Sequence, residues 1–517
     1  MPKSEERLVK VGSNKKNKIV TAVVITIVVL IIVAFGVYVT GIVPKLATGV
    51  NFYKVDENGN KVKFASASVN ELNYGYIQVL SSYSQNGGLQ GVDLDQVADP
   101  ATGETYYMRI LDSAAAELMN SYLVEEVADE AGYREHSGAA RYARLMYEDM
   151  IVPVAEYRGY PSATTYLHSM YGTGFTARNY LELNELICYV SEYNEYLAQF
   201  VFRPSAEDIQ AAYDENPDAY ERVDFNMYYF AAEVDEEGNA DLEAALELAE
   251  SVEAVAEDSE SFREGILEAF ADDEALVSAI EADETYTHYE GFNSTRTDAL
   301  CEGATEFLFD GTIPENAVNG EEGSSTVILE GANGYYLFLR EEPYLNEVDT
   351  YYYRCLTLSN DAATADNATP ESIAAGLETT IAEANAIMAQ VTDEMSFVDL
   401  LKDNTDYSEQ IITGGYYDMY TEDTFNPEDP STLANEHVAL GEWLASEDRV
   451  AGDMIVLPRD DNGAVSIYYY VETLPGWMAT ARATIVTASI NGWSANTILN
   501  QGATAEVNYS TMSALTY

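Results

Sequence analysis

Thiols and imidazoles, the side chains that most often carry chemistry, are scarce in this chain. The 517 residues include only four histidines and three cysteines, Cys188, Cys301 and Cys355. The cysteines are far apart and lack the close spacing of ligands that a zinc site requires. We therefore expect no metal site, no cofactor and no disulfide framework. Cys355 stands on an apolar stretch without a nearby histidine, which favours a small buried side chain over a catalytic thiol.

A second stretch that could do chemistry covers residues 396–419. Ser396 can cap a helix that presents Phe397 and the two leucines after it on one face. Residues 405–408 then form a polar loop. Gly414-Gly415 follows, and a glycine pair gives the backbone the freedom in φ that a turn before the next aromatic strand requires.

This order of a helix opening on Phe-x-x-Leu, a Ser/Thr-Asp loop and Gly-Gly resembles the parvulin family of peptidyl-prolyl isomerases. The resemblance implies a compact α/β fold with a small mixed sheet flanked by helices. It also implies catalysis by geometry, because the rotation barrier of about 18–20 kcal/mol falls when the amide is held twisted in a dry pocket. In the family, two histidines on the opening and closing strands and a Cys or Asp before Gly-Gly form that pocket.

The same order of elements occurs twice after Val223. Each copy opens on a strand, continues in helices and closes on a strand. In the first copy, these segments are residues 225–231, 242–282 and 334–339. In the second copy, the strands are residues 351–358 and 467–471, and the helices between them cover residues 373–391 and begin again at residue 397. Glu306-Phe307-Leu308 is echoed by Glu442-Trp443-Leu444. We infer two tandem parvulin-like modules, 223–346 and 347–476. The first is degenerate, because it has residues 286–292 in place of the Gly-Gly loop.

Both family histidines are missing from the second module. The resemblance places other residues at the pocket positions: Cys355 on the opening strand, Asp406 or Tyr407 in the loop, and Tyr468 or Tyr469 on the closing strand. The residues expected to contact a bound peptide are Gly414, Gly415, Met419 and Phe425. In the first module, the two strand positions fall on Tyr228 and Tyr336. Because the histidine pair is absent, we expect isomerase activity to be lost while binding persists.

A helical region precedes the modules. A hairpin is predicted at residues 51–64 around Asn58-Gly59, and helical periodicity extends from 69 to 202. The order of Ser68-Val69-Asn70-Glu71, the turn at Tyr171-Gly172 and Pro204-Ser205 resembles the helical chaperone domain of SurA- and PrsA-type foldases. This resemblance implies an α-helical chaperone-like domain over residues 44–222.

The N-terminus has the pattern of a membrane anchor. Residues 1–18 carry six Lys and Arg, and residues 19–43 carry no charge over a length that can span a bilayer. The excess of positive charge in residues 1–18 predicts a cytoplasmic head and an extracytoplasmic bulk. The expected fold class is therefore α+β multidomain, with a single N-terminal transmembrane helix, an α-helical chaperone-like domain and two tandem parvulin-like modules. Residues 477–517 have no assigned role.

The net charge of −62 limits the partners. Such a surface repels nucleic acid and attracts basic polypeptides. The leading hypothesis is a membrane-anchored extracytoplasmic chaperone that binds unfolded or extended secreted polypeptides, basic ones included. The alternatives are an active isomerase and a binding or structural protein of the cell surface that reuses the fold. The missing histidines favour binding over catalysis.

Overall fold

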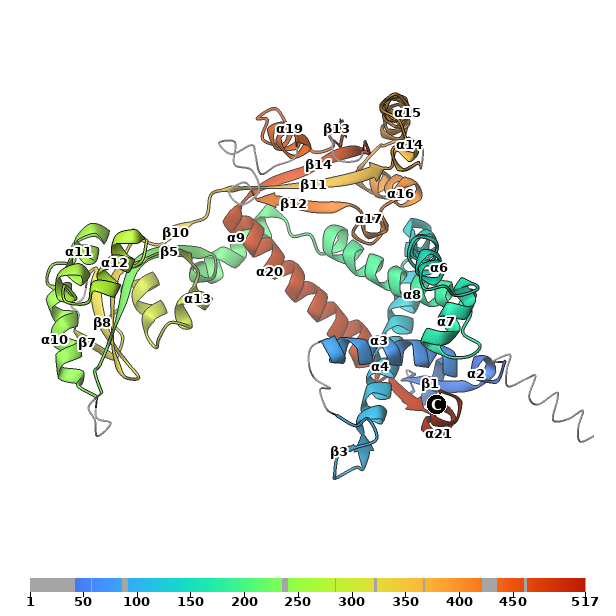
Figure 1. Cartoon of the computed structure of the whole chain (residues 1–517), viewed down its shortest axis with the longest axis horizontal. Helices are drawn as coiled ribbons and strands as arrows, with labels where there is room; N and C mark the ends of the chain where they lie inside the picture. Colours follow the sequence, from blue (N-terminus) through green and yellow to red (C-terminus); the bar gives the residue numbers. More distant parts are fainter. Residues whose placement is uncertain are drawn as a thin grey trace, which may run out of the picture.

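The chain is α+β and consists of a helical unit and two smaller α+β modules (Figure 1). The computed structural model describes residues 42–56, 58–85, 92–234, 240–283, 285–319, 323–365, 368–420, 435–459 and 463–516. We define the helical unit as residues 42–220 with 476–516, module 1 as residues 221–345, and module 2 as residues 349–475. In Figure 1, module 1 lies apart from the helical unit, while module 2 lies next to it.

The helical unit begins with α2 (Ile42–Leu46) and the hairpin of β1 (Thr48–Val55) and β2 (Lys61–Ser68). The hairpin predicted around Asn58-Gly59 is confirmed, with Gly59 at a φ of 80°. The helices that follow are α3 (Val69–Gln85), α4 (Tyr106–Glu130), α5 (Ala139–Met146), α6 (Val152–Tyr157), α7 (Ala163–Tyr171), α8 (Ala177–Tyr196) and α9 (Ala206–Glu215). A short hairpin, β3 (Val97–Asp99) with β4 (Glu104–Thr105), precedes α4, and a π-helical turn, Leu197–Val201, extends α8.

The end of the chain returns to complete this unit. Helix α20 (Gly476–Trp493) runs from module 2 back to the helical unit, as Figure 1 shows. Strand β15 (Thr504–Val507) then pairs antiparallel with β1, and α21 (Tyr509–Thr516) buries Met512 in the same core. The segment without an expected role is therefore part of the helical unit.

The two modules share one strand order. Module 2 contains β11 (Asp349–Leu358), α14 (Asp361–Thr364), α15 (Pro370–Met388), α16 (Glu394–Asn404), α17 (Ser408–Thr413), β12 (Tyr416–Tyr420), α19 (Asn435–Leu444), β13 (Met454–Pro458) and β14 (Val465–Pro475). Its sheet has the order β12-β11-β14-β13. Four helices, α14 to α17, separate its first two strands.

Module 1 repeats this plan. It contains β5 (Glu221–Ala231), α10 (Leu242–Glu253), α11 (Ser259–Ala269), α12 (Glu274–Ala282), β6 (His288–Phe292), α13 (Ser294–Asp298), β7 (Ala317–Asn319), β8 (Thr326–Gly331), β9 (Gly334–Arg340) and β10 (Tyr344–Leu345). Strand β5 lies between β6 and β9, and β8 follows β9, so these four strands have the order of module 2, while β7 and β10 are additions. The pairings between the described strands of both modules are antiparallel, so the expectation of a mixed sheet is wrong.

The expected fold class needs one correction. No helix among the residues that the structure describes is both long and apolar enough to cross a membrane. The transmembrane helix expected at residues 19–43 is therefore not a feature of the described fold. Residues 19–41 lie outside the described residues, and residues 42 and 43 open the five-residue helix α2.

Candidate functional site

The opening and closing strands of module 2 place two candidate residues side by side. Cys355 on β11 and Tyr468 on β14 are paired across the sheet, and both side chains are buried. Met419 of β12 belongs to the same apolar cluster, which Leu440 and Leu444 of α19 complete. Cys355, Tyr468 and Met419 therefore share one face of the sheet, packed against α19.

Cys355 lies beside a buried network of neutral polar groups. Gln410 donates from Nε2 to Thr357 Oγ1 over 3.0 Å and lies 3.7 Å from Cys355 Sγ. Its Oε1 accepts from Thr405 Oγ1 over 2.7 Å, and Thr357 Oγ1 lies 3.1 Å from Ser466 Oγ. Burial raises the pKa of the Cys355 thiol, so the thiolate form that a nucleophile needs is disfavoured. The network holds strands and helices together and offers no activated group.

The loop residues are engaged elsewhere. The Asp406 carboxylate accepts a hydrogen bond from the backbone N–H of Ser359 over 3.0 Å and lies 3.6 Å from Arg141 Nη2 of α5. Tyr407 is half-buried, and its backbone N–H donates to Thr405 Oγ1. The structure thus brings Cys355 and Tyr468 together but turns Asp406 towards the helical unit. The fourth expected peptide contact, Phe425, lies outside the described residues.

Both glycines of the Gly-Gly pair have left-handed backbone conformations, with φ of 61° at Gly414 and 64° at Gly415. A Cβ at Gly415 would lie 2.4 Å from the carbonyl oxygen of Cys355, so only glycine fits against the opening strand. The helix before the loop begins differently from the sequence-based expectation. Asp393 caps α16, and Ser396 occupies the third helical position of a capping box.

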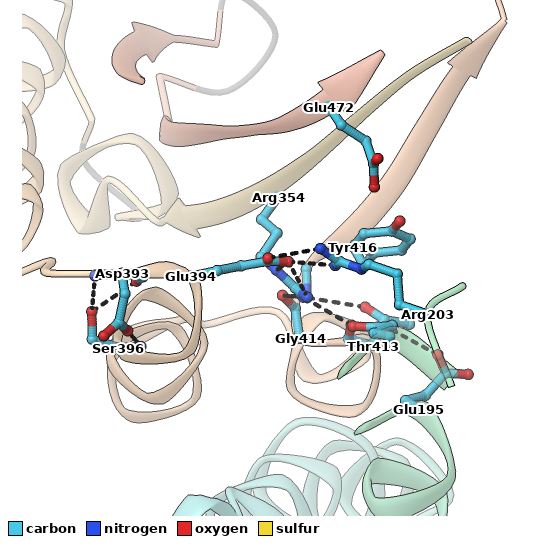
Figure 2. A network of polar contacts seen from close by, with 12 residues as sticks. Glu195, Arg203, Arg354, Asp393, Glu394, Ser396, Thr413, Gly414, Tyr416 and Glu472 are labelled. Atoms are coloured by element: carbon cyan, nitrogen blue, oxygen red, sulfur yellow. Dashed lines mark hydrogen bonds and ion pairs between the residues drawn. The ribbon is translucent and has the colours of Figure 1, made fainter. Parts of the chain in front are cut away.

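A buried arginine next to Cys355 connects this loop to the rest of the molecule (Figure 2). Arg354 is fully buried, and its guanidinium lies 2.8 Å from Glu394 Oε1 at the start of α16. Its Nη1 donates to the carbonyl oxygen of Gly414 over 2.9 Å. The rings of Phe200 and Tyr416 lie 4.9 and 5.0 Å from the cation. A desolvated arginine with these partners is costly to leave unpaired, so it fixes the geometry around it.

The helical unit supplies the remaining partners. Arg203 makes a bidentate ion pair with Glu394 at 2.9 and 3.1 Å, as Figure 2 shows. Gln199 accepts from Arg354 Nη1 over 3.0 Å and donates to the carbonyl oxygen of Thr413 over 3.1 Å. The Gly-Gly loop is therefore held against the end of α8. We call this surface of module 2, formed by α16, α17 and Gly414, the docking surface.

A second buried pair lies on the docking surface. Lys402 of α16 lies 3.5 Å from Glu192 of α8, and both side chains are almost completely removed from solvent. Lys402 also donates to the Tyr133 hydroxyl over 2.8 Å. Burial lowers the pKa of Lys402 and raises that of Glu192, while the charge of each partner opposes the shift of the other. Nearby, His136 Nδ1 lies 3.1 Å from Asp399.

The strand register identifies the counterpart of Arg354 in module 1. Arg354 is paired with Tyr416, the first residue of β12. Asn226 is paired in the same way with His288, the first residue of β6. Asn226 is thus the counterpart of Arg354, and it too is buried.

The same register corrects the positions expected for the first module. Counting along β5 and β9, Met227 and Phe338 are the counterparts of Cys355 and Tyr468. The residues expected from the sequence were Tyr228 and Tyr336. Tyr228 is one residue from Met227, so its side chain lies on the opposite face of the sheet. Tyr336 is two residues from Phe338, so its side chain lies on the same face but a full repeat further along the strand.

The side-chain partner of Asn226 also differs from that of Arg354. Asn226 Nδ2 donates to Ser259 Oγ over 2.7 Å. Ser259 is the first residue of α11, as Glu394 is the first residue of α16, and each follows an Asp cap with Ser at the third position. Module 1 therefore has a neutral hydrogen bond where module 2 has a buried ion pair.

Arg354 and the docking surface were missed at the sequence level, although a usable signal exists. The pattern Asp-x-x-Ser-Phe occurs at residues 258–262 and again at 393–397, and aligning these copies pairs Ser259 with Glu394. The partners Gln199 and Phe200, however, are more than 150 positions from Arg354 in the sequence. Only the fold brings them together.

Comparison with known proteins leaves the family assignment open. No protein-family model matches the chain, and no curated protein matches it in sequence.

Proposed function

We propose that this protein is a chaperone or foldase-like protein that binds unfolded or extended polypeptides without catalysing prolyl isomerisation. The observation that carries the proposal is a groove of about 490 Å³ in the helical unit, lined by both apolar and charged side chains. A volume of this size is in the range of sites that hold several side chains. The groove lies between the end of α8, α9 and α20, beside the segment that leads to module 1.

The lining of the groove suits a polypeptide segment. Val201, Phe202, Ala211, Ala212 and Ile485 give it apolar walls, and Arg203, Asp208 and Glu215 add charges. Val201 is 50% exposed, so the groove presents apolar surface to solvent. Apolar walls with a charged rim favour binding of chains that expose side chains normally buried.

The residues around Cys355 support binding without catalysis. The thiol is buried and its pKa is raised, Asp406 is bound to Ser359 and close to Arg141, and neither strand position carries a histidine. We therefore expect cis/trans relaxation of a panel of proline tetrapeptides to proceed at the rate measured in buffer alone. The extracytoplasmic location stays a prediction from the sequence.

The test uses the purified full chain and a chemically unfolded model protein. We expect the chain to suppress aggregation of the unfolded protein, and Val201→Asp to weaken that effect because a carboxylate disfavours apolar contact in the groove. Val97→Asp is the matched control, since Val97 is 48% exposed and lies on the distant β3 hairpin. Failure of the wild-type chain to bind unfolded protein would refute the proposal, and equal effects of both variants would move the binding site away from the groove.

A further inference from the structure

The docking surface of module 2 has a counterpart on module 1 that the helical unit does not occupy. Helices α11 and α12 pack on α10 and on the sheet of their own module. In Figure 1 they lie on the far side of the molecule from the helical unit. The position of Arg354 is taken by Asn226, whose Oδ1 is buried without a hydrogen-bond partner among the described residues.

Charge shows what kind of group the docking surface of module 2 accepts. Its acidic side chains Glu394, Asp399 and Asp406 meet the basic side chains Arg203, His136 and Arg141 of the helical unit. At these three contacts module 2 supplies the anion and the helical unit the cation, whereas the buried Lys402–Glu192 pair has the opposite polarity. Opposite charges across such a surface select the partner and set its orientation.

The counterpart surface of module 1 keeps the acidic character. Aligning the capped starts of α11 and α16 pairs Glu264 with Asp399 and Glu268 with Asp403, and both glutamates are exposed. Residues 241–284, which span α10 to α12, contain sixteen Asp and Glu against one Arg. Nothing in the described part of module 1 neutralises this surface in the way that the helical unit neutralises module 2.

An exposed aromatic residue adds to this surface. Tyr286 is the counterpart of Gly414, because it stands two residues before the first residue of β6 as Gly414 does before β12. Its side chain is 41% exposed. Its backbone N–H donates to the carbonyl oxygen of Asp283, so Tyr286 lies close to the C-terminal end of the acidic helix α12. An exposed tyrosine ring suits the side chain of Lys or Arg, which can lie over its face.

We propose that the α11–α12 surface of module 1, with Glu264, Glu268 and Tyr286, docks basic segments of client polypeptides. The inference rests on the proposed function and names the part of the chain that selects clients by charge. Module 2 uses the equivalent surface internally, so the protein keeps one acidic surface for its own architecture and one for its partners. The free acceptor of Asn226 lies at the position where module 2 holds a buried guanidinium.

The experiment compares two peptides on the full chain. One is a Lys- and Arg-rich peptide, and the other has Gln at every basic position. We expect Glu264→Gln/Glu268→Gln to weaken binding of the basic peptide about tenfold at physiological salt, where charges further apart than about 8 Å are screened. Binding of the Gln peptide should not change. The matched control is Glu243→Gln/Glu247→Gln on α10, which removes two exposed charges at the same spacing from the same module.

The outcomes separate the two proposals. A large loss for the α11 variant and less than about a twofold loss for the α10 variant support the docking of basic segments on this surface. Equal losses would mean general attraction to an acidic protein and would overturn the inference. An unchanged affinity of the α11 variant for the basic peptide would overturn it as well, while leaving the proposed function intact. If neither peptide nor unfolded protein binds the wild-type chain, the proposed function itself fails.

Discussion

Module 1 and module 2 have the same strand order and the same capped helix after Asp258 or Asp393, yet the chain uses them differently. Module 2 is fixed to the helical unit at two places, the end of α8 through Arg354 and α20 through Arg482. Module 1 is connected at its two ends, where Tyr220, just before the module, and Leu345 join a small apolar cluster around Trp477 of α20. Of two modules that share one strand order, one is thus docked on the helical unit and the other stands apart.

The difference shows how a buried charge can specify an interface. Arg354 and Glu394 replace the neutral pair of Asn226 and Ser259 at equivalent positions. A buried ion pair contributes little net stability compared with apolar packing, but removing one member leaves an unpaired charge. Undocking of module 2 would separate Glu394 from Arg203 and Arg354 from Gln199, so the buried pair disfavours the undocked arrangement.

The largest effect is expected from Arg354→Asn, which gives module 2 the residue of module 1. Glu394 loses one of its two arginines and the Gly414 carbonyl loses its donor, so we expect a loss of about 3–5 kcal/mol in the stability of the docked state. Native-state hydrogen exchange of residues 197–201 and 408–416 measures the loss. Asn226→Ala is the control and should cost about 1 kcal/mol. Similar losses in both modules would contradict the distinction between them.

The Gly-Gly loop provides the next test. Gly415→Ala places a Cβ against the Cys355 carbonyl in a left-handed conformation, and we expect a destabilisation of about 2–3 kcal/mol. Thr287 is its counterpart in module 1, where its carbonyl accepts from Met227 N–H. Thr287→Ala should cost about 1 kcal/mol, because no special backbone conformation is lost. Chemical denaturation, monitored by hydrogen exchange in each module, measures the two losses of stability separately.

A smaller effect is expected at the contact between module 2 and α20. Arg482 donates to Glu472 over 2.7 Å and to the Tyr416 hydroxyl over 2.6 Å. Arg482→Met keeps the apolar contact with Tyr352 but removes both hydrogen bonds, so we expect a loss of about 1–2 kcal/mol. Exchange rates in β14 should rise while those in β9 of module 1 stay the same. A parallel rise in β9 would show that the modules are coupled through α20.

The smallest effect concerns pH. Burial alone would raise the pKa of Glu394, but the hydrogen bonds and charges of Arg203 and Arg354 outweigh burial and hold it below its usual 4.5. A carboxylate of this kind stabilises the docked state fully above its usual pKa, and the contribution is lost as the pH falls through the lowered value. Docking should therefore weaken on acidification below about pH 4.5.

Glu394→Gln isolates this contribution. The variant should lose the part of the pH dependence that comes from Glu394, while the contribution of Glu192 remains. Burial raises the pKa of Glu192, so its protonation at acid pH acts in the opposite direction. The difference between wild type and variant, followed by hydrogen exchange of residues 408–416, measures Glu394 alone. An unchanged acid profile would show that the ion pair does not control docking.

Local signals predicted much of the fold. Asn58-Gly59 predicted the first hairpin, and α8 and α9 begin at local caps, Thr176 and Ser205, of the residue types that favour a helix start. These signals work because turns and caps depend on a few neighbouring residues. The helix cap at Ser396 was wrong because Asp393, three residues earlier, is the better acceptor for the same backbone groups.

Long-range features could not be predicted in the same way. The pairing of β15 with β1 joins residues more than 400 positions apart, and neither strand alone indicates its partner. The candidate site was predicted in part, since Cys355 and Tyr468 are neighbours. Asp406 was placed in the same pocket because the chain order suggested it, but Arg141 and the Ser359 backbone attract it elsewhere.

Spin-label distance measurements on the full chain test the docking of module 2 most directly. One label replaces the exposed Glu130 of the helical unit, and the second replaces Glu378 of module 2 or Glu247 of module 1. We expect a narrow distance distribution between Glu130 and Glu378 that broadens in Arg354→Asn, and a broad one between Glu130 and Glu247 that the substitution leaves unchanged. Equal widths for the two modules in the wild-type chain, or no response to Arg354→Asn, would contradict the account.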